Sequence, residues 1–335
     1  MAVRLGINGF GRIGRLVFRA LCESKRNDLE VVGINDLGSV AINALLLKHD
    51  SVHGHFPFEV KTGADTIDVG RGPIKVTAER DPAKLPWKDL GVDVALECTG
   101  IFTKREQAAK HIEAGAKRVL ISAPADGVDL TVVFGVNHDK LKKEHAVVSN
   151  ASCTTNCLAP VAQVLHQAVG IERGYMTTIH AYTGDQSLQD TLHKDVRRAR
   201  AANLSLIPTS TGAARAVGLV LPELKGKLDG TAIRVPTPNV SLIDLTFTSA
   251  RDTSADAINQ AIKQAADGRL KGILDYTNDE LVSVDFNHNP ASSTFDLTQT
   301  QVIDGKFARV MSWYDNEWGF SNRMLDTAAA MAKLL

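Results

Sequence analysis

The chain has 335 residues, 44% hydrophobic and 23% charged, and its 38 basic residues balance 38 acidic ones. This length allows two domains with separate cores. The charge balance excludes a bulk attraction to nucleic acid or anionic membrane, and no apolar run approaches the roughly 20 residues that a membrane helix needs.

Residues 1 to about 150 alternate short apolar runs with helical patterns. A helix is expected over residues 12–23, and Thr103 with Glu106 predicts a helix cap of the capping-box type. The alternation is typical of βαβ units and a parallel sheet covered on both faces. Strands are expected over residues 3–8, 30–35, 92–97, 118–122, 130–136 and 146–149.

The second half has a different pattern. A helix follows Cys153, and Pro160 inside it predicts a kink or a late start. Long β-rich stretches then predict an antiparallel sheet with helices on one face, and Asp304-Gly305 predicts a hairpin turn within it. Residues 184–203 lack apolar periodicity, so we expect a functional or interface loop. The β-rich stretches cover residues 175–183, 232–248 and 293–314, and a last helix covers 321–335.

A glycine-rich loop predicts a dinucleotide site. Gly9, Gly11 and Gly14 fit G-x-G-x-x-G directly after the first strand and at the start of a helix. Gly9 permits a tight turn, Gly11 lets backbone approach a pyrophosphate, and Gly14 lets helix and strand pack closely. The helix N-terminus attracts the phosphate charge.

Asp36 ends the second strand, 22 positions after Gly14. Its carboxylate can accept the ribose hydroxyls and would repel a 2′-phosphate, which favours NAD over NADP. The alternative is an ordinary turn residue in residues 35–38.

Cys153 stands at a strand-to-helix junction. Unpaired N–H groups and the helix dipole favour a thiolate there, and the same N–H groups can stabilise an oxyanion. Cys22 and Cys98 are expected to be buried and inert. Cys157 is interpreted as structural, because no nearby His or Cys completes a tetrahedral metal site with it and Cys153. So few cysteines predict a reducing, cytoplasmic location and no disulfide framework, and the first residues predict no secretory signal.

The thiol chemistry needs a base. His180 lies in an apolar, strand-like run, where a histidine is more often structural than catalytic. Ten histidines compete for the role, and spacing cannot choose among them.

Six short sequence segments, which occur in the same order as in a known family, carry a resemblance to it. From end to end the chain resembles the glyceraldehyde-3-phosphate dehydrogenases, and the bacterial form most closely. The alternative from another class is a nucleotide-binding or surface-adhesion protein whose dehydrogenase activity is incidental or lost, and intact Cys153 and His180 count against loss. The segments are residues 8–15, 149–157, 180–183, 211–214, 234–240 and 313–317.

The resemblance implies an α/β fold: a Rossmann-type NAD-binding domain over residues 1–150 and an α+β catalytic domain with a mostly antiparallel sheet over 151–316. A C-terminal helix over 317–335 would pack back on the NAD-binding domain. It also implies a homotetramer, with the loop around residues 184–203 reaching a neighbouring subunit.

The resemblance implies roles for named residues. Cys153 would be the nucleophile, and His180 would activate it and serve as the base in hydride transfer. The remaining contacts fall into three groups. NAD would be bound by Gly9, Gly11, Arg12, Ile13, Gly14, Asp36, Arg80, Ser122 and Asn316. The phosphate of the substrate would be bound by Thr183 and Arg234, and the second anion by Ser152, Thr154, Arg198, Thr211 and Gly212.

The implied reaction converts glyceraldehyde 3-phosphate, NAD and inorganic phosphate to 1,3-bisphosphoglycerate and NADH. Two departures leave the sulfur chemistry intact. Thr191-Leu192 stands where NAD-specific relatives often have Leu-Pro, which leaves the exclusive use of NAD over NADP open. Phe320 replaces a usual Tyr. An erythrose-4-phosphate dehydrogenase of the same fold is the nearest alternative.

Overall fold

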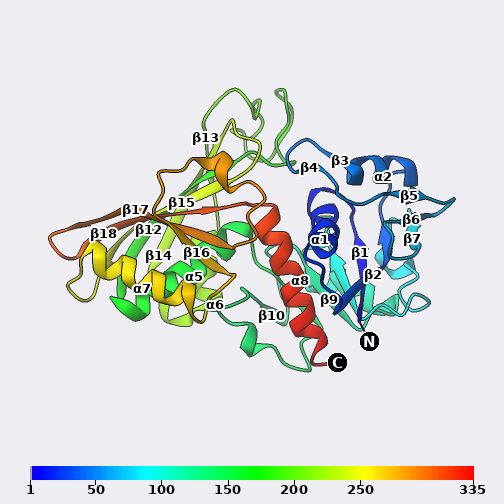
Figure 1. Ribbon diagram of the computed structural model, residues 1–335, viewed down its shortest axis with the longest axis horizontal. Helices are drawn as coiled ribbons and strands as arrows, with labels where there is room; N and C mark the ends of the chain where they lie inside the picture. The colour runs from blue at the N-terminus through cyan, green and yellow to red at the C-terminus, as the bar shows by residue number, and fades with distance from the viewer. Residues whose placement is uncertain (1) are drawn as a thin grey trace. The chain divides into compact units, whose positions relative to one another are not determined.

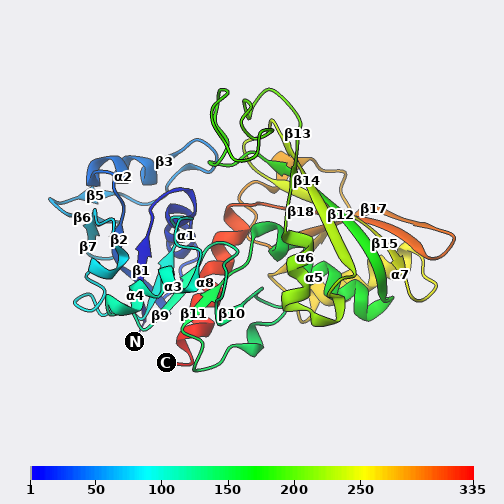
Figure 2. The ribbon, with the colours of Figure 1, turned by 180° about the vertical axis from the view of Figure 1, so that it is seen from behind.

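The computed structural model describes residues 2–335, which form two compact units. The first comprises the residues up to Ala151 together with Ser321–Leu335, and the second is Ser152–Phe320. Figures 1 and 2 show the elements of both units from opposite sides.

A nine-stranded sheet forms the first unit, in the order β10-β11-β9-β8-β1-β2-β7-β6-β5. It is parallel from β10 to β7 and ends in two antiparallel edge strands. This confirms the predicted Rossmann-type architecture. The strands are β1 (Val3–Asn8), β2 (Leu29–Asn35), β5 (Lys61–Thr62), β6 (Thr66–Asp68), β7 (Ile74–Thr77), β8 (Val94–Glu97), β9 (Arg118–Ile121), β10 (Leu130–Thr131) and β11 (Val147–Ser149), with a separate pair β3 (His49–Asp50) and β4 (Gly54–His55).

Helices pack on this sheet through apolar faces. In α1 (Arg12–Glu23) Leu16, Val17, Phe18 and Leu21 are buried, so the helix covers the sheet with the stripe that its sequence pattern predicts. The other helical segments are α2 (Val40–Lys48), α3 (Arg105–Ala108), α4 (Lys110–Glu113), the 3-10 helices η1 (Pro82–Lys84) and η2 (His138–Lys140), and α8 (Trp318–Ala332), which belongs to this unit from Ser321 on.

Two local predictions in this unit are wrong. Helix α3 begins at Arg105 with Lys104 as its N-cap, not at Thr103, because residues 103–105 pair with Asp126 in extended conformation. The strand expected over 130–136 ends at Thr131. There the Asn137 side chain bonds the Val133 N–H and the Thr131 carbonyl and holds a turn.

The second unit contains a seven-stranded sheet in the order β13-β14-β12-β15-β18-β17-β16. Of its neighbouring pairs only β12/β14 and β16/β17 are parallel, which confirms the mostly antiparallel prediction. Asp304 and Gly305 have positive φ and form the predicted turn between β17 and β18. The strands are β12 (Ile171–Ala181), β13 (Ile207–Ser210), β14 (Leu228–Val235), β15 (Ser241–Ser249), β16 (Leu274–Thr277), β17 (Ser293–Ile303) and β18 (Phe307–Tyr314).

Helix α5 (Cys153–Ala168) contacts both α6 (Ala213–Val220) and α7 (Ala255–Asp267), and the three form one layer over the sheet (Figure 1). Of the kink or late start expected from Pro160, the late start is wrong. The helix begins at Cys153, because the Ser152 hydroxyl caps it by accepting from the Thr155 N–H at 3.0 Å. Two 3-10 helices complete the unit, η3 (Pro222–Leu224) and η4 (Ser283–Phe286).

The long loop was predicted correctly. Residues 184–203 form neither helix nor strand. None of the helices formed by residues 2–335 is long and apolar enough to cross a membrane.

Candidate active site

The glycine loop of the first unit follows β1. Gly9 has φ +90°, and a Cβ there would lie 2.7 Å from the Thr99 nitrogen, so the turn requires glycine. A Cβ on Gly14 would lie 2.0 Å from the Gly9 carbonyl oxygen, which confirms the close contact of helix and strand. At Gly11, the N-cap of α1, nothing lies within 4 Å of an added Cβ, so the backbone is open to a ligand.

Asp36 joins this loop to the next one. One carboxylate oxygen accepts from the Phe10 N–H at 2.8 Å, and the other accepts from the Gly38 N–H at 2.9 Å. Asp36 therefore does stabilise a turn, as the alternative interpretation predicted. Each oxygen keeps further acceptor capacity, and the residue lines the cavity described next.

A cavity of about 340 Å³ opens at the carboxyl ends of β1, β2 and β8. This is the edge of a doubly wound sheet where dinucleotides bind. Gly9, Gly11, Asp36 and Arg80 line it, while Ser122 hydrogen-bonds the Cys98 thiol. The remaining lining residues are Asn8, Asn35, Leu37, Glu79, Cys98, Thr99, Ile101 and Phe102.

A buried polar network beneath the cavity was not predicted. Glu97 accepts from Asn8 Nδ2 at 2.6 Å and from the Thr99 N–H at 2.8 Å, and Asn8 accepts from Asn35 at 2.8 Å. On the other side His111 Nε2 lies 2.9 Å from Glu97. Because the Trp87 N–H can only donate, and donates to His111 Nδ1, the His111 proton is on Nε2 and points at Glu97. The network fixes the residues that form the cavity floor.

Arg12 is oriented by a buried carboxylate. Its Nη1 donates to Asp50 at 2.6 Å. Burial by itself would raise the pKa of Asp50, but hydrogen bonds from the His53 N–H, Arg12 and the Val52 N–H lower that pKa to about 2.

Asp50→Asn is therefore expected to reduce the free energy of unfolding by about 2 kcal/mol at pH 7. Since the folded-state pKa is depressed, this contribution is present above the unfolded value near 4 and is lost as the pH falls toward 2. Urea unfolding of both proteins at pH 7 and pH 3 measures it. A deficit that stayed constant between these pH values would contradict the assignment.

The second unit places Cys153 at the first position of α5. Its sulfur lies 3.5 Å from His180 Nε2, so the histidine that spacing could not select faces the thiol. His180 comes from β12, and its register partner on the parallel strand β14 is Arg234.

Hydrogen bonding fixes the tautomer of His180. Nδ1 lies 2.7 Å from the Ala181 carbonyl oxygen, which can only accept, and 3.2 Å from Arg234 Nη1, which can only donate. The carbonyl contact is the shorter one, and Arg234 Nη1 itself donates to that carbonyl at 2.9 Å, so we assign the proton to Nδ1 and the acceptor role to Nε2. Burial, reinforced by the positive charge of Arg234, lowers the pKa of His180 to about 3. The ring is therefore neutral at physiological pH, with its basic nitrogen directed at the sulfur.

The simple expectation of a low thiol pKa at the helix N-terminus is wrong. Burial raises the pKa of Cys153, and the Arg234 charge and the hydrogen bonds of Thr154 only oppose that effect. Burial also raises the pKa of Cys22 to about 11, and those of Cys98 and Cys157 to about 12. Cys153 differs from these three because a neutral imidazole lies beside its sulfur.

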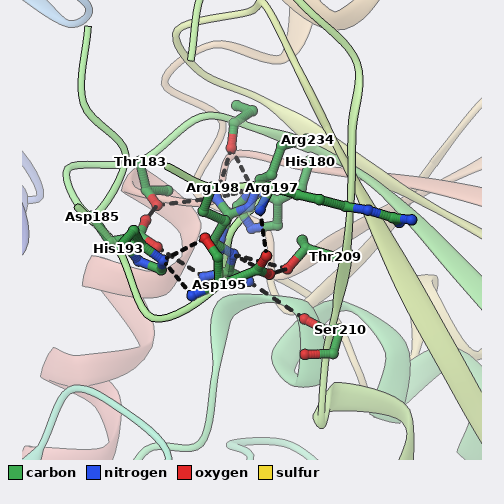
Figure 3. Close-up of polar contacts among 11 residues, drawn as sticks. His180, Thr183, Asp185, His193, Asp195, Arg197, Arg198, Thr209, Ser210 and Arg234 are labelled. Atoms are coloured by element: carbon green, nitrogen blue, oxygen red, sulfur yellow. Dashed lines mark hydrogen bonds and ion pairs between the residues drawn. The ribbon is translucent and has the colours of Figure 1, made fainter. Parts of the chain in front are cut away.

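Groups suited to anions lie around His180 (Figure 3). Arg234 Nη1 donates to the Thr183 hydroxyl at 3.0 Å, and its buried Nε has no partner among the described residues. Arg198 donates to Thr209 at 2.9 Å and reaches the Ser210 carbonyl at 3.4 Å. The Arg197 side chain extends away from the others, as expected for a solvated residue.

The N-terminus of α6 supplies Thr211 and Gly212. The Thr211 hydroxyl accepts from the Ala213 N–H at 3.2 Å, and the Ala213 carbonyl accepts from Thr155 of α5 at 3.3 Å. The starts of α5 and α6 therefore meet, which brings Thr211 and Gly212 near the Ser152 cap. The structure thus joins most of the residues predicted for the second anion site.

Thr154 and Asn316 are buried by neighbours that sequence reasoning missed. The hydroxyl of Tyr314 lies 2.8 Å from that of Thr154, so the Thr154 side chain points inward. Ser241 accepts from the Ala181 N–H at 3.0 Å and donates to Asn316 at 2.8 Å. This ties Asn316 to the strand that carries His180. No local signal marks Ser241. Tyr314 falls in the segment of residues 313–317, but its contacts with the Thr154 and Thr178 hydroxyls join residues far apart in sequence.

A dinucleotide fold in one unit and a thiol–imidazole pair among cationic groups in the other define the class of nicotinamide-dependent oxidoreductases. Sequence comparisons refine the class. Residues 3–105 match the NAD binding domain of glyceraldehyde 3-phosphate dehydrogenase, and residues 152–316 match its C-terminal domain.

Full-length relatives match the chain from end to end. The chain is 72% identical over 334 residues to the glyceraldehyde-3-phosphate dehydrogenase of Xanthobacter flavus, with 100% of both chains covered. It is 66% identical to that of Cereibacter sphaeroides, with 100% of both covered, and 58% identical to that of Geobacillus stearothermophilus, with 99% of both covered. The chain belongs to the glyceraldehyde-3-phosphate dehydrogenase family, and its cofactor is NAD.

Proposed function

We propose that the chain oxidises D-glyceraldehyde 3-phosphate with NAD and inorganic phosphate, through a thioester on Cys153, to 1,3-bisphosphoglycerate. The observation that carries the proposal is the 3.5 Å contact between Cys153 Sγ and an unprotonated His180 Nε2. The names of the relatives support this substrate and do not favour the erythrose-4-phosphate alternative.

His180 handles two protons in this scheme. As Cys153 Sγ bonds to the aldehyde carbon, the thiol proton passes to Nε2 and on to the new alkoxide, which gives a hemithioacetal. Nε2 then takes the hydroxyl proton while the carbon is oxidised. NAD, when bound, supplies the hydride acceptor for that oxidation. N–H groups at the start of α5 would stabilise the developing oxyanion.

Phosphate completes the cycle. A phosphate oxygen attacks the thioester carbon, the carbon–sulfur bond breaks, and Cys153 leaves as thiolate. Arg234 and Thr183 are proposed to hold the substrate phosphate, and the orphaned Arg234 Nε–H supports this role. The attacking phosphate is proposed to be held by Arg198, the N-terminus of α6 and the backbone at the start of α5, residues 152–154, since the Thr154 hydroxyl itself points inward to Tyr314.

The test is the initial rate of NADH formation from glyceraldehyde 3-phosphate and NAD, with and without inorganic phosphate. Fast turnover that requires phosphate is expected. Equal rates under both conditions would contradict the phosphorolysis step, and faster turnover of erythrose 4-phosphate would reassign the substrate.

Asp36→Gly is expected to lower the preference for NAD over NADP by about tenfold, because a charge that repels the 2′-phosphate is removed. Asp36 also supports Phe10 and Gly38, so Asp36→Asn is the companion variant: it removes the charge, keeps one of the two acceptor oxygens, and is expected to lower the preference in the same direction. The ratio of kcat/KM for the two cofactors is the measurement. If neither variant altered that ratio, another loop would set the preference.

We also propose that the chain works as a homotetramer. Five large apolar side chains are exposed on or beside the long loop, a pattern typical of an interface. These exposed residues are Leu188, Leu192, Val196, Leu204 and Leu206. Light scattering of the purified chain tests the assembly.

We further propose a reducing, cytoplasmic location. All four cysteines are free thiols, which supports it.

A further inference from the structure

Asp185 occupies an unusual place between the two proposed phosphate sites. It accepts the hydroxyl proton of Thr183, and its other oxygen accepts from Arg198 Nη1 at 2.8 Å (Figure 3). A threonine hydroxyl has only one proton to donate. Thr183 therefore cannot donate to a phosphate while it donates to Asp185.

The charges around Asp185 already balance. Arg198 and Arg234 supply two cations, and Asp185 and Asp195 supply two carboxylates, with Asp195 3.8 Å from Arg198 Nε. Two histidine rings lie beside these groups: His180, which is neutral as argued above, and His193, whose Nδ1 contacts the backbone of Asp195. An incoming phosphate therefore meets a cluster whose positive charge is already matched, and it must displace a carboxylate to gain its full interaction energy.

The environment of Asp185 keeps it charged. Burial raises its pKa, but the Thr183 hydrogen bond and the charges of Arg234 and Arg198 outweigh burial, and the pKa is lowered. Its contacts are those that a phosphate oxygen would make with the same hydroxyl and guanidinium.

We propose that Asp185 is an internal anion that holds the phosphate-binding groups until a phosphate dianion displaces it. It is a specificity-determining residue, because an unphosphorylated aldehyde has no charge with which to compete. The inference rests on the proposed roles of Thr183, Arg198 and Arg234.

The experiment measures protection of Cys153 against alkylation by increasing inorganic phosphate, at constant ionic strength and with the intact chain. In Asp185→Asn the phosphate concentration for half-protection is expected to be about fivefold lower than in the wild type. Asp185→Ala, which also removes the acceptor for Thr183, is expected to shift it in the same direction.

Asp190→Asn is the matched control. Asp190 lies in the same loop and pairs with Arg200 at 2.6 Å. The substitution therefore removes one negative charge, as Asp185→Asn does, but from an exposed ion pair outside the cluster. Its half-protection concentration is expected to equal that of the wild type.

The outcomes separate the inference from the proposed function. If phosphate protects the wild type, and the Asp185 variants need as much phosphate or more, then Asp185 orders Arg198 instead of competing, and the inference alone fails. If phosphate does not protect the wild type at all, the phosphate sites are misassigned, and the inference fails with them.

Discussion

Replacement of Cys153 by alanine is expected to reduce the rate of NADH formation by at least about 10⁴-fold, because the covalent adduct can no longer form. NAD binding should persist, since the glycine loop, Asp36 and the cavity belong to the other unit. Initial rates together with calorimetric titration of NAD measure both effects. Cofactor binding lost along with turnover would indicate misfolding.

Cys157→Ala is the control for this variant. Cys157 lies one turn further along α5, and its sulfur contacts the Ser293 hydroxyl at 3.1 Å, away from His180. It should retain most of the activity. Mapping of limited alkylation should label Cys153 first, and earlier labelling of Cys22 or Cys98 would remove Cys153 as the reactive thiol.

The second large effect is expected from His180→Asn, which should slow hydride transfer by about 10²- to 10⁴-fold and also reduce alkylation of Cys153. One nitrogen serves both steps, so both rates should fall together. Single-turnover NADH formation and iodoacetamide reactivity measure them. Loss of one rate alone would assign the other step to a different group.

The pH dependence of Cys153 alkylation follows from the protonation state of His180. The pKa of His180 is lowered to about 3, so the imidazole is neutral between pH 5 and 8 and is protonated only near its folded-state value. Alkylation of the wild-type thiol should therefore rise with pH without an inflection from His180 in that interval. An inflection near pH 6.5 that disappears in His180→Asn would show that the ring titrates as in water. His166→Asn, at the far end of α5, should behave as the wild type.

Local patterns predicted local features well. The glycine spacing, the helix over residues 12–23 and the Asp304-Gly305 turn depend on backbone geometry that neighbouring residues determine, and all three agree with the structure. The cap at Thr103 failed because Asp126, distant in sequence, pairs with that segment. No pattern around residue 103 reports such a partner.

The chemistry of the site depended on contacts that sequence does not contain. The choice of His180 among ten histidines needed the position of β12 relative to the start of α5. The thiol pKa was misjudged because the helix terminus is visible in sequence whereas burial is not. Glu97 and His111 were missed for the same reason: they look like an ordinary strand end and an ordinary helix residue.

The parallel pairing of β12 with β14 has a consequence for the architecture of the chain. Parallel neighbours require a long crossover, and here the crossover is residues 182–227, which carry Asp185, Arg198, Thr211 and Gly212. The connection that topology demands thus also delivers the anion-binding groups to the edge where His180 and Arg234 stand. These groups therefore lie in one continuous segment, residues 176–235, which could be transferred as a unit to another protein scaffold. A segment without residues 184–203 would keep the strands β12, β13 and β14 but would lose Asp185 and Arg198.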